Sequence, residues 1–110
     1  MRVLITGGFG FIGGCLGQHL HQLGYDVVLC SRSANGPPEW LPKVETEKVI
    51  WNDQNSIDKI CNDVDIVVHA AGMNAEECAA DPVAALEFNG LNTSRILQSA
   101  IRSGVKRFIY

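Results

Sequence analysis

Five short apolar runs recur along the chain, separated by segments with helical periodicity. The runs are unbroken rather than alternating, which is typical of strands buried on both faces of a parallel sheet. Their sequences are RVLIT, DVVLC, EKVIW, DIVVHAAG and KRFIY, at residues 2–6, 26–30, 47–51, 65–72 and 106–110. The pattern therefore predicts five strands.

Two helices are predicted in the first half of the chain. The first covers residues 11–23, and Gly24 supplies its C-cap. Its apolar face should comprise Phe11, Ile12, Cys15, Leu16, Leu20 and Leu23, which recur at helical spacing. A short second helix is expected at residues 56–61, with Ser56 as its N-cap.

A longer third helix is predicted at residues 82–102. Asp81 can cap it, Pro82 suits its first turn, and Gly104 follows its end. One side of this helix carries Ala85, Phe88, Asn92, Ile96 and Ala100. This side should pack on the sheet.

Strands that alternate with helices predict an α/β fold with right-handed crossovers. We expect a Rossmann-type doubly wound parallel sheet of strand order 3-2-1-4-5, truncated after the fifth strand. A chain of 110 residues, 46% hydrophobic and 19% charged, fits one globular domain over residues 1–110.

Composition and charge exclude several function classes. A net charge of −3 provides no basic field, so neither nucleic acid nor a membrane surface is an expected partner. No apolar stretch approaches the ~20 residues of a membrane span, and no signal peptide precedes the first strand. Cys15, Cys30, Cys61 and Cys78 form no C-x-x-C pair, so we expect reduced thiols in a cytoplasmic protein, with Cys15 and Cys30 packed, and no metal site.

The first strand runs into the glycine-rich sequence TGGFGFIGG, residues 6–14. Glycine inside a regular element costs roughly 0.5–1 kcal/mol relative to alanine, so this stretch needs a reason. Gly7 permits the tight turn, Gly10 lets a diphosphate approach the backbone, and Gly13 lets the helix pack closely on the strand. The free N–H groups around Phe11 and Ile12, with the helix dipole, predict a pyrophosphate site. The alternative is a glycine-rich turn that serves packing alone.

The segment TGGFGFIG resembles the T-G-x-x-G-F-I-G opening of extended short-chain dehydrogenases/reductases, the epimerase/dehydratase group. HAAG at residues 69–72, DP at 81–82, NGLNTSRIL from Asn89 and the fifth strand KRFIY resemble further segments of that family. The resemblance covers the whole chain. Asn92 departs from it, since the family commonly has glycine there.

The resemblance implies a set of cofactor-binding residues at the ends of the strands and the start of the first helix. Gly7, Gly10, Phe11, Ile12 and Gly13 would line the pyrophosphate. Small residues would run along the adenosine ribose and phosphates, namely Ala70, Ala71 and Gly72.

Three further positions are implied. Asp53 would accept a hydrogen bond from the adenine amine, and Gln54 would lie against the adenine. Asn89 would bridge the cofactor-side backbone from within the long helix. Asn74 stands where some relatives have a lysine that touches a ribose. Without the resemblance, a solvated loop acid would be the favoured interpretation of Asp53.

The end of the second strand bears on the choice between NAD and NADP. NAD-preferring sites place an acid there to hold the ribose hydroxyls, whereas this chain has Ser31 followed by Arg32. A 2′-phosphate would meet no repulsion, and Arg32 could pair with it. We therefore favour NADP and keep NAD open; the alternative is that Arg32 is a solvent-exposed loop residue.

The family's catalytic Y-x-x-x-K motif is absent, since neither Tyr25 nor Tyr110 has a lysine four residues later. We therefore expect no catalytic residue here, and give His69 a structural role. The first hypothesis is the cofactor-binding portion of an epimerase, dehydratase or reductase that acts by hydride transfer on a nucleotide sugar or similar alcohol or ketone. Its small-molecule substrate would bind only in a longer parent chain. The alternative is a non-catalytic dinucleotide-binding or sensing module.

The fifth strand is expected at one edge of the sheet, with nothing paired to its outer side. Free N–H and C=O groups on an apolar edge are a template for association. We therefore expect an isolated 110-residue polypeptide to self-associate through this strand or to be only partly stable.

Overall fold

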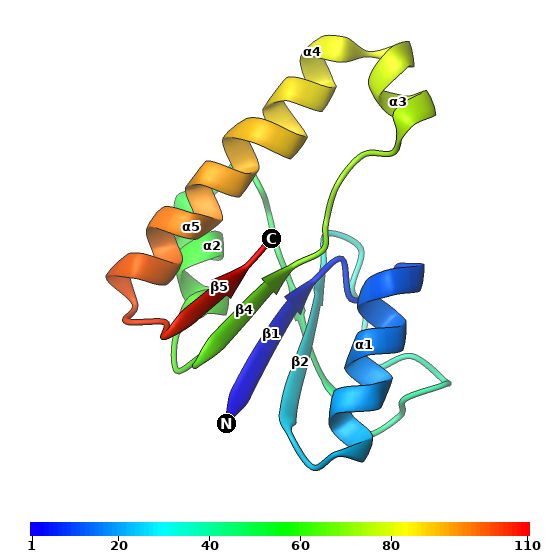
Figure 1. The fold of residues 1–110 in the computed structure, drawn as a ribbon, viewed down its shortest axis with the longest axis vertical. Helices are drawn as coiled ribbons and strands as arrows, with labels where there is room; N and C mark the ends of the chain where they lie inside the picture. The colour runs from blue at the N-terminus through cyan, green and yellow to red at the C-terminus, as the bar shows by residue number, and fades with distance from the viewer.

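A computed structural model describes all 110 residues and contains one five-stranded parallel sheet (Figure 1). The strand order is β3-β2-β1-β4-β5, which confirms the predicted α/β class and topology. The strands are β1 (Arg2–Thr6), β2 (Asp26–Ser31), β3 (Glu45–Lys48), β4 (Ile66–His69) and β5 (Arg107–Ile109).

The helices lie on both sides of the sheet, with α1 on one side and α2 and α5 on the other (Figure 1). They are α1 (Phe11–Gln22), α2 (Gln54–Cys61), α3 (Ala75–Ala80), α4 (Pro82–Ala85) and α5 (Asn92–Arg102), with a π-helical segment η1 (Leu86–Leu91) between the last two. The predicted third helix is thus the continuous series α4, η1 and α5. The short helix α3 was not predicted.

The central strands β1, β2 and β4 place alternate residues in two different cores, which is why their sequences are largely apolar, whereas β3 (ETEK) has no buried residue. Leu4 of β1 lies in the core under α2 and α5, whereas its neighbours Val3 and Ile5 lie in the core on the other face. Leu16 and Leu20 of α1 pack against the second core. The unbroken apolar runs are therefore a consequence of double-sided burial.

The fully buried positions of α1 are glycines, and of the predicted apolar face only Leu16 and Leu20 pack against the core. Gly13, Gly14 and Gly17 are its buried positions, while Phe11 and Ile12 are 86% and 73% exposed. A Cβ on Gly17 would lie 2.6 Å from Leu29 Cδ2, so the helix approaches the sheet too closely for a side chain there. The prediction was also wrong for Cys15, which is exposed; Cys30 is buried as expected.

The third strand ends earlier than predicted, and the second helix begins earlier. After β3 the backbone turns away from the sheet, and the N–H of Ile50 donates to Ser56 Oγ at 2.9 Å instead of to a strand. Asp53, not Ser56, is the N-cap of α2, because its carboxylate accepts a hydrogen bond from the N–H of Asn55 at 3.0 Å. Both errors arise because Ser56 closes this turn.

A capping box starts α3. The side chain of Asn74 accepts from the N–H of Glu77, and the carboxylate of Glu77 accepts from the N–H of Asn74, both at 2.9 Å. All four thiols are unpaired, and burial raises the pKa of Cys30 to about 12. None of the helices has the length and apolar character needed to cross a bilayer.

Candidate functional site

Two adjoining cavities lie where the carboxyl ends of the strands meet the α4–η1–α5 rod. Their volumes are about 190 and 560 Å³, and we call them together the cleft. The chain leaves β1 toward β2 on one side and later enters β4 on the other, so the cleft adjoins the point where the strand order reverses. Ligands of open α/β sheets bind at this point.

The smaller cavity brings together residues from the ends of three different strands. Six of the predicted cofactor-binding residues line it: Gly7, Ser31, Arg32, Ala70, Ala71 and Gly72. These residues are far apart in the sequence and meet only because β1, β2 and β4 are neighbours in the sheet. The structure therefore assembles the predicted small-residue wall in one place.

The glycine turn after β1 depends on close backbone approach. Gly7 has a φ of +66°, and a Cβ there would lie 2.8 Å from the carbonyl carbon of Ala70. A Cβ on Gly13 would collide with the carbonyl oxygen of Gly7. Gly10 differs, since its Cβ would approach only that oxygen, at 3.3 Å. Gly7 and Gly13 are therefore required by packing, whereas packing alone requires Gly10 far less.

The N-terminus of α1 has no internal partner for its free amides. Gly10 is the N-cap and has no side chain to accept from them, and the first turn contains no acidic residue. The N–H groups at the start of a helix carry a partial positive charge. The first turn, with Phe11 and Ile12 facing solvent, can thus accept an anion at its backbone.

Arg32 forms one side of the cleft and lines both cavities. Its guanidinium carbon lies 5.7 Å from the centre of the Phe88 ring, and none of the ion pairs of the structure involves it. Ser31 beside it bonds to Ser33 through its hydroxyl. The strand end therefore offers a cation that is in no ion pair, although Glu77 lines the same two cavities.

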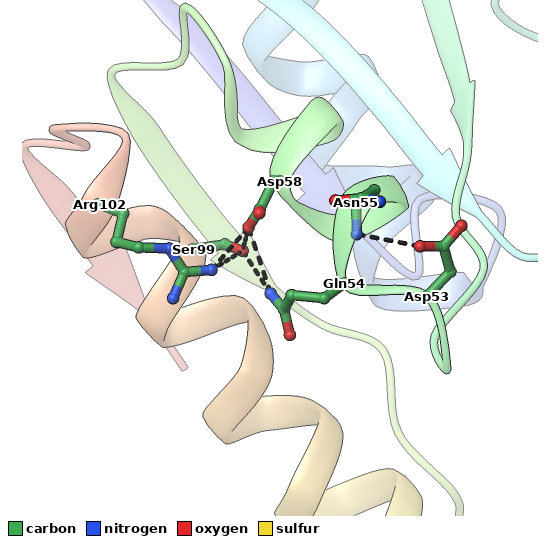
Figure 2. Close-up of polar contacts among 6 residues, drawn as sticks. All are labelled: Asp53, Gln54, Asn55, Asp58, Ser99 and Arg102. Carbon is green, nitrogen blue, oxygen red and sulfur yellow. Dashed lines mark hydrogen bonds and ion pairs between the residues drawn. The ribbon is translucent and has the colours of Figure 1, made fainter.

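Asp53 and Gln54 line neither cavity. Figure 2 shows the polar contacts that they make instead. Asp53 caps α2, and Gln54 points the other way, toward α5, where its amide donates to Ser99 Oγ at 2.9 Å. Asp58 accepts from Ser99, Arg102 and Gln54, and these hydrogen bonds lower its pKa to about 2. Gln54 thus lies in the α2–α5 junction, whereas Asp53 caps α2, a role that an aspartate at a helix start could have indicated.

Asn89 bridges the backbone as the sequence predicted. Its amide oxygen accepts from the N–H of Met73 at 2.8 Å, and its amide nitrogen donates to the carbonyl of Met73 at 3.3 Å. A Cβ on Gly72 would lie 3.3 Å from the same amide oxygen. Asn89 therefore holds the segment that follows β4 against η1.

His69 ends β4 and is only 5% exposed. Its Nδ1 lies 2.7 Å from Thr6 Oγ1 and its Nε2 lies 3.0 Å from Thr93 Oγ1. The rings of Trp51, Phe108 and Tyr110 surround it. Burial among these uncharged groups lowers the pKa of His69 to about 4, so the ring is neutral at physiological pH.

Several residues of the larger cavity were not predicted as site residues. They are Lys48, Trp51, Met73, Glu77, Glu87, Phe88 and Arg95. Only Phe88 carried a signal, because it lay on the inward side of the predicted long helix. Arg95 donates to the carbonyl of Trp51 at 3.1 Å and to Asn92 Oδ1 at 3.0 Å, and so ties the loop after β3 to α5.

Comparison with known proteins identifies relatives over the whole chain. The family model described as "NAD dependent epimerase/dehydratase family" matches residues 3–110. A UDP-glucose 4-epimerase from Klebsiella pneumoniae is 31% identical over all of this chain and 87% of its own length. One from Bacillus subtilis is 28% identical over all of this chain and 36% of its own length.

Solved structures are also similar to this chain over nearly its whole length. The UDP-glucose 4-epimerase of Thermus thermophilus in complex with NAD superposes on all of this chain with a TM-score of 0.85 and 29% identity. An epimerase from Methanothermobacter thermautotrophicus gives 0.86 and 30% over 99% of this chain. The chain spans 37% and 34% of these two structures.

The burial of neutral His69 predicts a pH dependence of stability. The unfolded chain binds a proton at His69 below pH 6.5, whereas the folded chain does so only near pH 4. The free energy of unfolding should therefore fall as the pH is lowered through this window, by roughly 3 kcal/mol at ~1.36 kcal/mol per unit. Urea unfolding between pH 4 and 7 measures it.

Asp58 and Asp65 titrate at lower pH, because hydrogen bonds lower the pKa of both from 3.8. Their contribution is lost only below this window. The matched variant His69→Gln should remove the slope between pH 4 and 6.5. A wild-type unfolding free energy that is flat there, or an NMR titration in which His69 protonates near pH 6.5, would contradict the prediction.

Proposed function

The chain belongs to the NAD-dependent epimerase/dehydratase family, and from this premise we propose that its cleft binds a nicotinamide dinucleotide. The observation that carries the proposal is the meeting of Gly7, Arg32 and Ala70–Gly72 at one cavity. Relatives whose structures contain NAD, from Thermus thermophilus and Bifidobacterium longum, share this fold at 29% and 28% identity.

In this proposal the pyrophosphate lies against the first turn of α1, at Gly10, Phe11 and Ile12, and the adenosine lies along the wall made by Ala70–Gly72. Asp53 keeps one carboxylate oxygen on the N–H of Asn55 and offers the other to the adenine amine. The side chain of Gln54 is engaged with α5, so only its backbone remains for the adenine.

We propose that residues 1–110 are the cofactor-binding domain of an enzyme that acts by hydride transfer on a nucleotide sugar or a similar alcohol or ketone. The UDP-glucose 4-epimerases among its relatives support this over the non-catalytic module. The Y-x-x-x-K motif is absent from these residues, so the chemistry and the small-molecule substrate belong to a longer polypeptide that joins this domain to that motif.

NADP is the favoured cofactor of the proposal. Arg32 has no carboxylate partner and stands over Phe88 at the mouth of both cavities, where a 2′-phosphate could pair with it. Such a charge-assisted hydrogen bond contributes about 1.5–3 kcal/mol. Neutral Ser31 at the end of β2 leaves the phosphate without repulsion.

We further propose that the protein is cytoplasmic and does not bind nucleic acid. Four free cysteines suit the reducing cytoplasm, and the net charge of −3 argues against binding to nucleic acid. Cell fractionation that found the protein in an oxidising compartment would contradict the first point. A gel shift with duplex DNA at low salt would contradict the second.

Gly10→Val should abolish cofactor binding and preserve the fold. The added side chain occupies the space of the pyrophosphate, while its Cβ approaches only the Gly7 carbonyl oxygen. Calorimetric titration with NAD and NADP should show at least a hundredfold loss with a native circular dichroism spectrum. Gly90→Ala adds a methyl in ordinary contact with Leu86, away from the cleft, and should bind as the wild type does. Undiminished binding by folded Gly10→Val would mean that the glycines serve packing alone.

Arg32→Ala should weaken NADP binding about ten- to a hundredfold and change NAD binding little. The matched control is Lys43→Ala, which removes the same charge from an exposed position outside the cleft. Calorimetric titration of the wild type and both variants measures the affinity for NAD and the affinity for NADP. An equal loss for NAD and NADP, or no loss at all, would refute the phosphate role.

We also propose that a polypeptide of residues 1–110 self-associates through β5. This strand has no neighbour on its outer side, and Ile109 and Tyr110 are 45% and 81% exposed. Light scattering should find species larger than a monomer. A monodisperse monomer with cooperative unfolding would overturn this proposal.

A further inference from the structure

A circuit of hydrogen bonds joins β1, β4 and the π-helical segment around the wall of the cleft. From the wall, the N–H of Ala71 donates to Thr6 Oγ1 at 3.2 Å, and that hydroxyl contacts His69 Nδ1. On the other side of the ring, Nε2 contacts Thr93 Oγ1, whose hydroxyl donates to the carbonyl of Asn89 at 2.7 Å. The Asn89 side chain then returns to the wall at Met73.

In each hydrogen bond of the circuit, the donor and the acceptor are determined. Thr93 uses its one hydrogen on the carbonyl of Asn89, so it can only accept from His69, and Nε2 must carry a proton. In the neutral ring Nδ1 is then an acceptor, and the hydroxyl of Thr6 donates to it. Thr6 Oγ1 still accepts from the N–H of Ala71. Every polar atom in this run is satisfied by one tautomer.

The circuit holds the wall at two points. Ala71 is held through Thr6, and Met73 is held through Asn89, with Gly72 between them. A Cβ at that middle position would lie 3.3 Å from the Asn89 amide oxygen, a tight contact that glycine avoids. The distance between Ala71 and Met73 depends on the contact between β1 and the η1–α5 helix. The side chain of His69 makes this contact, because it bonds to Thr6 on one side and to Thr93 on the other.

We infer that His69 is a positioning residue, which, as the Nε2-protonated tautomer, sets the place of the Ala70–Met73 wall against the glycine turn. The inference rests on the proposed dinucleotide site for its effect on binding, but the tautomer and the wall belong to the protein itself. The π-helical segment contributes, because it includes Asn89, four residues before Thr93 in the first turn of α5.

The test uses the 110-residue protein and the pair Thr93→Val and Thr93→Ser. Valine has the shape of threonine without its hydroxyl and interrupts the circuit, whereas serine retains the hydroxyl. Thr93→Val should bind NAD and NADP about three- to tenfold more weakly, the effect of one net hydrogen bond, and Thr93→Ser should restore wild-type affinity. In Thr93→Val the amide of Met73 should also exchange with solvent faster.

Ser99→Ala is the matched control for stability. It removes a buried hydroxyl from the same helix, in the junction with Asp58, and touches no member of the circuit. Its cofactor affinity should equal that of the wild type at a temperature where all variants are folded. Equal weakening by Ser99→Ala and Thr93→Val would make the effect one of stability, and the inference would fail.

Nitrogen-15 NMR of the imidazole in the cofactor-free protein completes the test. At pH 7, His69 should be protonated at Nε2 and unprotonated at Nδ1. The opposite tautomer would overturn the inference even if the cofactor binds. If the wild type binds neither NAD nor NADP, the proposed function fails, while the tautomer and the exchange of Met73 still decide whether His69 positions the wall.

Discussion

The fold depends on one close approach of backbone to backbone, where the turn after β1 meets the exit of β4. Gly7 passes so near Ala70 and Ala71 that any Cβ would overlap with their peptide, and Gly13 rests on the carbonyl of Gly7. This contact sets three things together: the separation of β1 and β4 at their carboxyl ends, the depth at which α1 lies on the sheet, and the bare backbone that faces the cleft. The cost of so many glycines is offset by a geometry that no other residue permits.

The same constraint explains which parts were predictable. The central strands, the strand order and the turn at Gly7 follow from apolar runs and a glycine motif, which are local signals with a clear physical cause. The site role of Ala70–Gly72 was implied by the family resemblance, and that of Arg32 by its position after the second strand. The buried face of α1 was mispredicted because apolar periodicity identifies large residues, whereas this interface excludes them. The predicted end of β3 and start of α2 were wrong because the Ser56 hydroxyl accepts a hydrogen bond from the backbone N–H six residues earlier. Local propensity does not predict such a side-chain contact.

The long helix shows the other limit of sequence reasoning. Its inward side was predicted from spacing, but the π-helical segment within it was not, since one extra residue per turn leaves no mark in the apolar pattern. That segment presents Phe88 to the cleft and Asn89 to the wall. Asn92, where the family commonly has glycine, is buried, and its side chain accepts from Arg95. The buried amide oxygen is therefore satisfied, and the departure adds a tie to Trp51 rather than a defect.

Two positive features lie at the carboxyl ends of the strands in a protein of net negative charge. Arg2 and Arg102 lie in ion pairs with neighbouring carboxylates, whereas Arg32 at the cleft has none. The first turn of α1 is likewise left without a side-chain cap or an acid. Water solvates the Arg32 guanidinium and the N–H groups at the start of α1, so neither destabilises the fold. Each would form a favourable electrostatic contact when an anion displaces that water. In the proposed dinucleotide site, a ligand with phosphates at both ends of an adenosine would meet both features at once, whereas a mononucleotide with one phosphate would meet only one.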